Sequence, residues 1–245
     1  MKILANDGIS QSGIDDLTAA GFEVLTTTVA QEQLVNFINS ENIVALLVRS
    51  ATTVRQDLID ACPGLKIIGR GGVGMDNIDV GYAREKGLSV INTPAASSES
   101  VAELVFAHLF SGVRFLYDSN RSMPLEGEKK FKNLKKAYAK GTELRGKTLG
   151  VIGFGRIGQA TAKMALGLGM KVIAFDPFME KTTVSLSFFD GQTVDFEIKT
   201  VSKETVLKES DFITLHVPAQ KDFVIGEAEL DMMKEGAALI NAARG

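Results

Sequence analysis

A glycine-rich turn between two apolar runs constrains the fold of this chain more than any other feature. Residues 147–158 read KTLGVIGFGRIG, the next apolar run is Met170–Phe175, and Asp176 closes that run. The order is strand, glycine turn, helix, strand and acid, because Val151 and Ile152 form a buried-strand run and the segment after the glycines has helical spacing of apolar residues. We therefore predict a parallel β–α–β unit of the kind that binds dinucleotides.

Each glycine of this turn has a separate physical task. Gly153 allows the tight turn, Gly155 lets the backbone approach a pyrophosphate, and Gly158 lets the helix pack close to the strand. Asp176 can accept hydrogen bonds from ribose hydroxyls and would repel a 2′-phosphate, so NAD is preferred over NADP. A turn with a purely structural role is the alternative. The predicted cofactor contacts in this segment are Gly153, Gly155, Arg156, Ile157, Gly158 and Asp176.

The composition is that of a globular chain without a nucleic-acid or membrane partner. The 245 residues are 45% hydrophobic, which is enough for one or two domains with substantial cores. The net charge is −3 with both signs interspersed, so no basic field favours nucleic acid or an anionic membrane. The lysine-rich segment 129–140 is the local exception, which fits a solvated face or the attraction of an anionic ligand.

The single cysteine and the N-terminus both favour a cytoplasmic protein. Cys62 has no partner for an internal disulfide and cannot form a cysteine zinc site, so no metal is expected. Met1 leads directly into the strand-like run Lys2–Ala5 without the regions of a signal peptide, and no run is long enough to span a membrane.

Apolar runs alternate with amphipathic segments in the first half of the chain, which predicts an open, doubly wound α/β sheet of the flavodoxin kind. We place a domain boundary at residue 97. Residues 1–97 are then a substrate-binding domain, and residues 98–245 are an incomplete Rossmann NAD-binding domain. The strands expected in the first domain are 3–5, 22–26, 43–48, 66–68 and 88–91, and the helices are 13–20, 31–39, 55–61 and 78–85.

Three further features organise the second domain. Residues 98–120 have the apolar spacing of one long helix that leaves the first domain. Residues 183–198 contain two strand-like runs around Asp190–Gly191, which predicts a surface hairpin with a tight Asp-Gly turn and no readable function. The last two expected strands are 212–217 and 237–240.

Further motifs accompany the glycine turn along the whole chain. They are VRSAT at 48–52, GRGGVGMDNID at 69–79, NTP at 92–94, SVAEL at 100–104, LHVP at 215–218 and NAARG at 241–245. In this order they resemble the NAD-dependent D-2-hydroxyacid dehydrogenases, most closely the D-3-phosphoglycerate dehydrogenase branch. The resemblance implies oxidation of 3-phospho-D-glycerate to 3-phosphohydroxypyruvate, the entry to serine biosynthesis, with hydride transfer to the nicotinamide.

Arg244 is the candidate catalytic residue. It follows the last expected strand, at the sheet edge where open α/β folds bind ligands, and its planar guanidinium matches a carboxylate. The resemblance implies the same role, in which Arg244 holds the carboxylate and carbonyl oxygen of the substrate. It also implies that the cofactor cleft is lined by Val217, Pro218, Ala242 and Ala243.

The first domain carries candidate substrate contacts. The glycines of Gly71–Gly74 suggest a loop whose N–H groups bind an anion, although a structural turn fits the sequence equally well. The resemblance makes this the substrate carboxylate loop, with Val73 also near the nicotinamide. Arg49 and Ser50 end an apolar run and are candidates for the substrate's phosphate or its neighbouring hydroxyl. The predicted substrate-binding residues are Arg49, Ser50, Gly71, Gly72 and Val73.

The proton-transfer half of such a site is not in the sequence. The family's acid/base histidine and its glutamate follow the arginine motif, so we expect the chain to be part of a longer protein and inactive alone. Neither His108 nor His216 is assigned as the general base. The open alternatives are a dehydrogenase or reductase of another small 2-hydroxy acid, such as glyoxylate or D-lactate, and a non-catalytic NAD-sensing protein. The apolar helix 98–120 predicts a homodimer.

Overall fold

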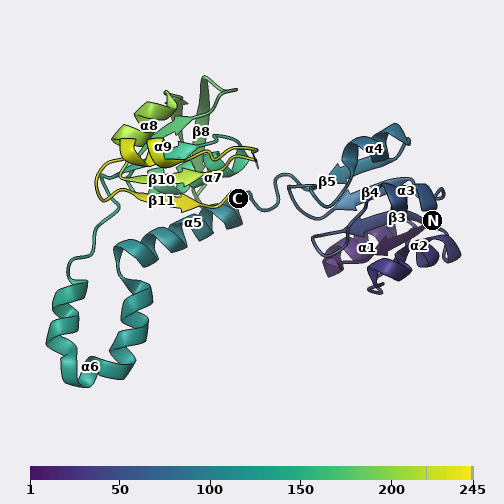
Figure 1. Ribbon diagram of the computed structural model, residues 1–245, viewed down its shortest axis with the longest axis horizontal. Coiled ribbons are helices and arrows are strands. Elements are labelled where there is room, and N and C mark those ends of the chain that lie inside the picture. The colour runs from purple at the N-terminus through teal and green to yellow at the C-terminus, as the bar shows by residue number, and fades with distance from the viewer. Residues whose placement is uncertain (219, 244–245) are drawn as a thin grey trace. The chain divides into compact units, whose positions relative to one another are not determined.

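The computed structural model describes residues 1–218 and 220–243, and the chain divides into two compact units, 1–97 and 98–245. Unit 1 is built on a parallel sheet with strand order β2-β1-β3-β4-β5, the flavodoxin-like order that the sequence predicts (Figure 1). Its strands are β1 (Lys2–Ala5), β2 (Glu23–Leu25), β3 (Ile43–Val48), β4 (Ile67–Arg70) and β5 (Ser89–Asn92), and its helices are α1 (Gln11–Ala19), α2 (Gln31–Ser40), α3 (Gln56–Ala61) and α4 (Val80–Glu85).

The core of unit 1 explains why these segments form these elements. Strand β3 is the central strand, and Ile43, Leu46 and Val48 are almost completely buried in it. A strand covered on both faces by helices needs a nearly continuous apolar run, which the sequence IVALLV supplies. Because all strands run parallel, their carboxyl ends meet at one edge, where the loops that follow β1, β3, β4 and β5 gather.

The described part of unit 2 contains a parallel sheet of order β11-β10-β6-β7, with the Rossmann-like arrangement that the glycine turn predicts. Strand order reverses between β6 and β10, so the turn after β6 lies at the topological switch point. The elements around this sheet are α5 (Ser98–Val113), β6 (Thr148–Ile152), α7 (Arg156–Gly167), β7 (Lys171–Phe175), α8 (Lys203–Glu209), β10 (Phe212–Leu215), α9 (Glu227–Met232) and β11 (Ala238–Asn241).

The prediction of one helix over residues 98–120 is wrong. Helix α5 ends at Val113, and a second helix, α6, runs over Leu116–Tyr138. Phe115 separates them with a left-handed backbone, at φ 55°. A bulky residue adopts that conformation rarely, so the residue type at position 115 does not predict the break.

The predicted hairpin is confirmed, with a different turn. Strands β8 (Lys181–Ser187) and β9 (Thr193–Lys199) pair antiparallel. The Gly191 N–H donates to the Phe188 carbonyl at 3.0 Å, and Gly191 has a left-handed φ of +84°. The connection is therefore a three-residue loop with glycine at the left-handed position, and not a two-residue Asp-Gly turn.

Among the described residues, no helix combines the length and apolar character needed to cross a membrane.

Candidate functional site

The turn between β6 and α7 requires the absence of a side chain at two glycines. Gly153 has a left-handed φ of +91°, and a Cβ atom there would lie 2.6 Å from the carbonyl oxygen of His216. A Cβ atom at Gly158 would lie 2.2 Å from the carbonyl oxygen of Gly153. Both obstacles are backbone atoms, which cannot swing aside as a side chain can. The close packing of α7 against the strands therefore depends on glycine at both positions.

Gly155 is free of such a structural requirement. Its φ of −71° and ψ of −161° suit any residue, and a Cβ atom there would meet nothing within 4 Å. The open space lies at the N-terminus of α7, where the first N–H groups, including those of Arg156 and Ile157, have no acceptor within the helix. A helix N-terminus of this kind attracts phosphate through its N–H groups and its dipole. The open space fits a dinucleotide pyrophosphate.

The carboxylate of Asp176 lies beside this turn, at the end of β7. Its Oδ2 accepts the N–H of Phe154 at 2.8 Å, and its Oδ1 accepts the N–H of Phe178 at 2.9 Å. Each carboxylate oxygen can accept a further hydrogen bond, because it has two lone pairs. Asp176 therefore both fixes the glycine turn and keeps acceptor capacity for ribose hydroxyls.

The predicted contacts after β10 and β11 lie at the same edge of the sheet. Leu215 pairs with Ile152 on one side and with Asn241 on the other, so the segments that follow these three strands leave the sheet side by side. Val217 is in contact range of the turn, since its Cγ1 would lie 3.0 Å from a Cβ atom at Gly153. The remaining predicted contacts at this edge are Pro218, Ala242 and Ala243, and Arg244 lies outside the described residues.

His216 is held neutral next to the turn. His216 Nε2 lies 3.2 Å from the Thr161 hydroxyl, which donates to the Ile157 carbonyl at 2.9 Å, and 3.1 Å from the Thr214 hydroxyl. The other ring nitrogen, Nδ1, is buried without a hydrogen-bond partner among the described residues. Burial lowers the pKa of His216 from 6.5 to about 4. His216 is a packed residue behind the turn, which agrees with leaving it unassigned as a base.

The carboxyl edge of the sheet in unit 1 forms a second candidate site, a pocket of about 710 Å³. Arg49 and Gly71, both predicted, line it, and so do Arg70 and Asp7, which the sequence analysis did not select. The pocket lining does not include Ser50, Gly72 or Val73, although they belong to the same loops. Two arginines and one acid give the pocket a positive balance that suits an anionic ligand.

The loop that carries Arg49 is clamped on both sides. Asp7 accepts the N–H groups of Arg49 at 2.7 Å and Thr52 at 3.1 Å, and the Thr52 hydroxyl at 2.5 Å. Asn77 donates to the carbonyl of Arg49 at 2.9 Å and to that of Thr52 at 2.7 Å. Burial alone would raise the pKa of Asp7, but these hydrogen bonds outweigh it and lower the pKa. The charged carboxylate of Asp7 thus fixes the backbone that presents Arg49.

The loop Gly71–Gly74 has fewer backbone N–H groups available to bind an anion than its sequence suggests. The N–H of Gly71 donates to the Val48 carbonyl and that of Gly72 to the Arg70 carbonyl, each at 2.9 Å. These two donors are taken, so the loop can offer an anion at most the N–H groups from Val73 onward. A Cβ atom at Gly72 would overlap the Arg70 guanidinium, which is the far end of a flexible side chain and can move aside.

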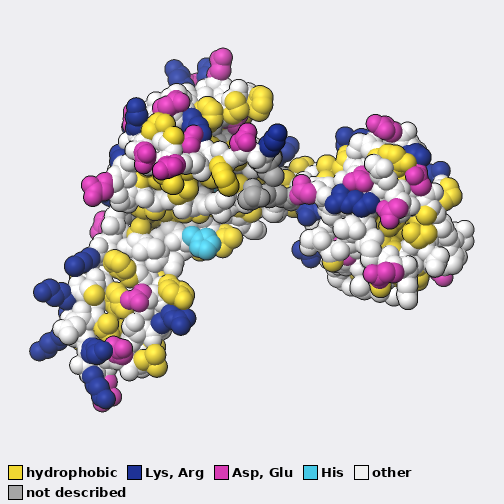
Figure 2. All heavy atoms as spheres, viewed as in Figure 1, with side chains coloured by type: hydrophobic (Ala, Val, Ile, Leu, Met, Phe, Trp, Pro, Cys, Tyr) yellow, Lys and Arg dark blue, Asp and Glu magenta, His cyan; other side chains and the backbone are white. Residues whose placement is uncertain are grey.

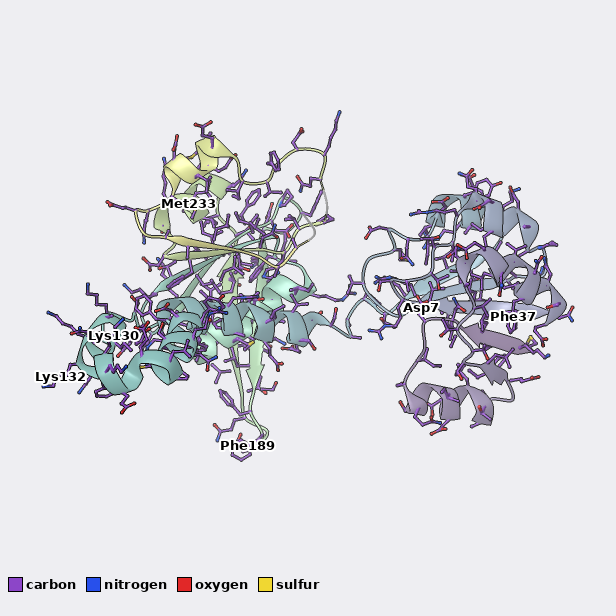
Figure 3. All side chains as sticks on the ribbon, turned by 60° about the horizontal axis from the view of Figure 1, so that its bottom comes forward. Asp7, Phe37, Lys130, Lys132, Phe189 and Met233 are labelled. Carbon is purple, nitrogen blue, oxygen red and sulfur yellow. The ribbon has the colours of Figure 1, made fainter. Side chains whose placement is uncertain are left out.

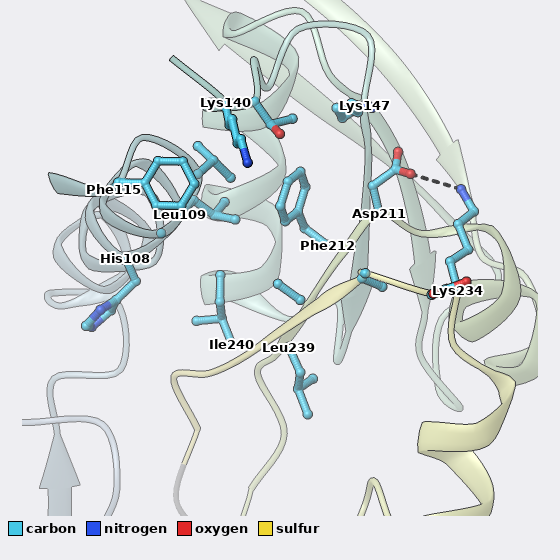
Figure 4. Close-up of a pocket in the computed structure, with 17 residues that line it drawn as sticks. His108, Leu109, Phe115, Lys140, Lys147, Asp211, Phe212, Lys234, Leu239 and Ile240 are labelled. Atoms are coloured by element: carbon cyan, nitrogen blue, oxygen red, sulfur yellow. Dashed lines mark hydrogen bonds and ion pairs between the residues drawn. The ribbon is translucent and has the colours of Figure 1, made fainter. Parts of the chain in front are cut away.

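A further cavity of about 640 Å³ in unit 2 contains none of the predicted site residues (Figure 4). It lies between α5 and the strands β10 and β11. Its polar groups include Asp211, whose Oδ1 pairs with Lys234 Nζ at 3.2 Å and whose Oδ2 accepts the N–H of Thr148 at 2.8 Å. Asp211 therefore already has partners within the chain, which makes the cavity a weaker candidate for a ligand site than the glycine turn.

Comparison with known proteins gives a family for this arrangement. Residues 106–245 match the model of the D-isomer specific 2-hydroxyacid dehydrogenase, NAD binding domain. The chain is 43% identical to the hydroxypyruvate reductase of Thermotoga maritima, over 91% of this chain and 67% of that protein. It is 38% identical to the D-3-phosphoglycerate dehydrogenase of Archaeoglobus fulgidus, over 100% of this chain and 44% of that protein.

A solved structure gives the same relationship. The cofactor (NAD+)-bound 3-phosphoglycerate dehydrogenase of Entamoeba histolytica matches with a TM-score of 0.71 and 28% identity, over 100% of this chain and 72% of that one. The chain spans less than half the length of the Archaeoglobus relative.

Proposed function

Because the chain belongs to the D-isomer specific 2-hydroxyacid dehydrogenase family, we propose that it serves an NAD-dependent oxidation of 3-phospho-D-glycerate to 3-phosphohydroxypyruvate. Arg49 and Arg70 both line the pocket of unit 1, and the presence of these two cationic side chains is the observation that supports a phosphorylated substrate. A substrate with both a carboxylate and a phosphate needs two separate sets of cationic or N–H donors. This reaction would place the protein in serine biosynthesis, in the cytoplasm.

NAD is the cofactor, and the turn after β6 fits it. When bound, NAD supplies the acceptor for the hydride that leaves the substrate carbon. The chain's own contribution is positioning: the open backbone at Gly155 receives the pyrophosphate, and Asp176 accepts from the ribose. Val73, Val217, Pro218, Ala242 and Ala243 are proposed as the apolar lining of the cofactor cleft.

The proposed contacts bind opposite ends of the substrate, one set at its carboxylate and the other at its phosphate. Arg244 is proposed to bind the carboxylate and the carbonyl oxygen, where a planar guanidinium gives paired hydrogen bonds. Arg49 is proposed for the phosphate, with Ser50 for the neighbouring hydroxyl. The loop Gly71–Gly74 is proposed to bind the carboxylate through the N–H groups from Val73 onward, because those of Gly71 and Gly72 are already bonded within the chain.

Replacing Arg49 tests the phosphate assignment. Arg49→Ala should weaken the binding of 3-phospho-D-glycerate by about tenfold to a hundredfold, because a charge-assisted hydrogen bond is lost. Binding of unphosphorylated D-glycerate should change much less. Isothermal titration with both ligands in the presence of NAD gives the two affinities. Arg55→Ala is the matched control, since Arg55 is exposed and pairs with Asp79 outside the pocket. Unchanged phosphoglycerate affinity in Arg49→Ala would refute the assignment.

Asp176 should determine the relative affinity of the protein for NAD and NADP. Asp176→Asn removes the negative charge but keeps one oxygen acceptor, so the expected result is weaker NAD binding, by about tenfold, and a relative gain for NADP. Fluorescence titration of the wild type and the variant with NADH and NADPH measures both effects. Asp190→Asn, in the hairpin loop, is a control of equal charge change. An unaltered ratio of the two affinities would remove Asp176 from ribose recognition.

The hydroxypyruvate reductase relative, at 43% identity, makes reduction of an unphosphorylated 2-oxo acid the second candidate function. A non-catalytic NAD-sensing protein is the third. An assay of the whole gene product with NAD and a panel of phosphorylated and unphosphorylated 2-hydroxy acids separates them. Turnover of phosphoglycerate above the other acids supports the first proposal, turnover of another acid supports the second, and NAD binding without turnover supports the third.

A homodimer is proposed through α5. Ala102, Val105 and Leu109 face the core, while Leu104 and Phe110 remain exposed along the helix. Exposed apolar side chains on a helix favour contact with another apolar surface.

A further inference from the structure

Phe154, inside the glycine turn, is held from three sides. Its side chain is completely buried in the core of unit 2. Its N–H donates to Asp176 Oδ2 at 2.8 Å, and its carbonyl oxygen accepts Gln159 Nε2 at 2.9 Å. A carbonyl oxygen can only accept, so the amide nitrogen of Gln159 is the atom that faces it. The peptide groups on both sides of Phe154 are therefore fixed in orientation.

Gln159 also holds the next carbonyl of the turn. Its own N–H donates to the Gly155 carbonyl at 2.9 Å, in the first turn of α7. The side chain and the backbone of this one residue thus bind two successive carbonyls, those of Phe154 and Gly155. A planar trans peptide points its N–H group opposite to its carbonyl. The N–H groups of Gly155 and Arg156 are therefore directed away from Gln159, toward the N-terminal side of α7.

These two N–H groups are available to a ligand. Among the described residues, neither the Gly155 N–H nor the Arg156 N–H has an acceptor. Both residues are exposed, and a Cβ atom at Gly155 would meet nothing within 4 Å. Successive N–H groups that point to one side at a helix N-terminus suit the oxygens of a phosphate or pyrophosphate.

We infer that Gln159 is a positioning residue of the NAD site, whose side-chain amide holds the Phe154 carbonyl and thereby aims the Gly155 N–H at the pyrophosphate. The amide of Gln159 faces the protein and not the cofactor. Asp176 binds the other side of Phe154, so one buried residue sets both the ribose acceptor and the pyrophosphate donor. This role rests on NAD as the cofactor of the proposed function and adds a residue to its site.

Gln159→Met tests the role, because methionine has a similar length and helix preference but no donor. The affinity for ADP-ribose, which contains the pyrophosphate, should fall about tenfold, since a charge-assisted N–H bond is misaligned. The affinity for adenosine, which has a ribose and no phosphate, should stay nearly the same, because Asp176 keeps its place. Displacement of NADH, followed by fluorescence, measures both affinities. A general distortion of the turn would move Asp176 as well and weaken both ligands.

Gln192→Met is the matched control, because it makes the same exchange at an exposed residue of the hairpin loop. That loop, marked by Phe189 in Figure 3, extends away from the sheet of unit 2. Neither ligand affinity should change in this variant.

Charge alone can also attract ADP-ribose to this protein. Figure 2 shows basic side chains around α6, and such a surface binds anions in a manner that salt screens. Each titration is therefore repeated at about 0.15 M and about 0.5 M salt. The tenfold difference between the wild type and Gln159→Met should persist at the higher salt concentration.

The combination with Gly155→Ala shows whether both residues act on the same group. In Gly155→Ala the added methyl group already excludes the pyrophosphate, so Gln159→Met should weaken ADP-ribose binding by no more than about twofold further. Two effects that multiply in the double variant would mean that Gln159 acts elsewhere, which would overturn the inference.

A measurement on the wild type applies even if Gln159→Met fails to fold. In ¹H–¹⁵N spectra, ADP-ribose should shift the backbone amide signal of Gly155 and leave the side-chain amide signal of Gln159 nearly unchanged. A large shift of the Gln159 signal would make it a direct ligand. That shift, or equal ADP-ribose affinity in Gln159→Met and the wild type, would overturn the inference while the proposed function stands. A wild type that does not bind NAD would overturn both.

Discussion

Gly155→Ala should separate cofactor binding from folding more cleanly than any other single change in this chain. A Cβ atom at this position meets nothing in the protein and the backbone angles suit alanine, so the melting temperature should stay within about 1 °C of the wild type. The methyl group would occupy the space into which the pyrophosphate fits. Such overpacking costs about 1–3 kcal/mol, which corresponds to NAD affinity weaker by about tenfold to a hundredfold.

Gly158→Ala is the informative comparison, because it adds the same methyl group three residues later. There the Cβ atom would lie 2.2 Å from a backbone oxygen, and α7 would have to shift away from the strands. We expect a loss of about 3 kcal/mol in the free energy of unfolding, a melting temperature lower by about 6 °C or more, and the loss of NAD binding. Calorimetric melting and isothermal titration with NAD measure both variants. Equal NAD affinity in Gly155→Ala and the wild type would contradict the proposed position of the pyrophosphate.

Acidification should destabilise the protein through His216. The folded-state pKa of His216 is lowered from 6.5 to about 4 because burial removes the ring from water and disfavours its charged form. Between these two pH values the unfolded chain binds more protons than the folded chain, so stability is complete above about pH 6.5 and falls toward about pH 4. A pKa difference of this size corresponds to about 3 kcal/mol at most.

Urea unfolding followed by circular dichroism, between about pH 7 and about pH 4.5, measures this dependence. In His216→Gln the part of the pH dependence that belongs to the ring should disappear, although the variant loses some packing at neutral pH. His108→Gln is the control, because His108 is exposed on α5. Parallel pH profiles of the wild type and His216→Gln would show that another group accounts for the loss.

The regular elements were predictable because their patterns are local. Runs such as Ile43–Val48 and Lys171–Phe175 read directly as buried parallel strands, and the glycine spacing after β6 fixes a strand–turn–helix unit. The hairpin was predictable for the same reason. Its loop was not, because the turn type depends on which residue adopts the left-handed conformation, and both Asp190 and Gly191 suit such a position.

The errors and omissions come from features that are not local. Phe115 adopts a left-handed conformation that only the surrounding packing imposes, so the end of α5 has no sequence signal. Asp7 and Asn77 reach the Arg49 loop from positions 42 and 28 residues away, and such a clamp appears only when the strands are assembled. Arg70 could have been selected, because it ends a strand in the same sheet as Arg49.

The arrangement of strands along the chain also bears on how the protein is made. All partners of every strand in unit 1 lie within residues 1–97, so this unit can fold during synthesis as soon as its residues leave the ribosome. In unit 2, β6 pairs with β10, whose residues are synthesised about 60 positions later. Until then, one edge of the buried strand β6 has no partner, and this half of the nascent chain depends longest on protection from aggregation.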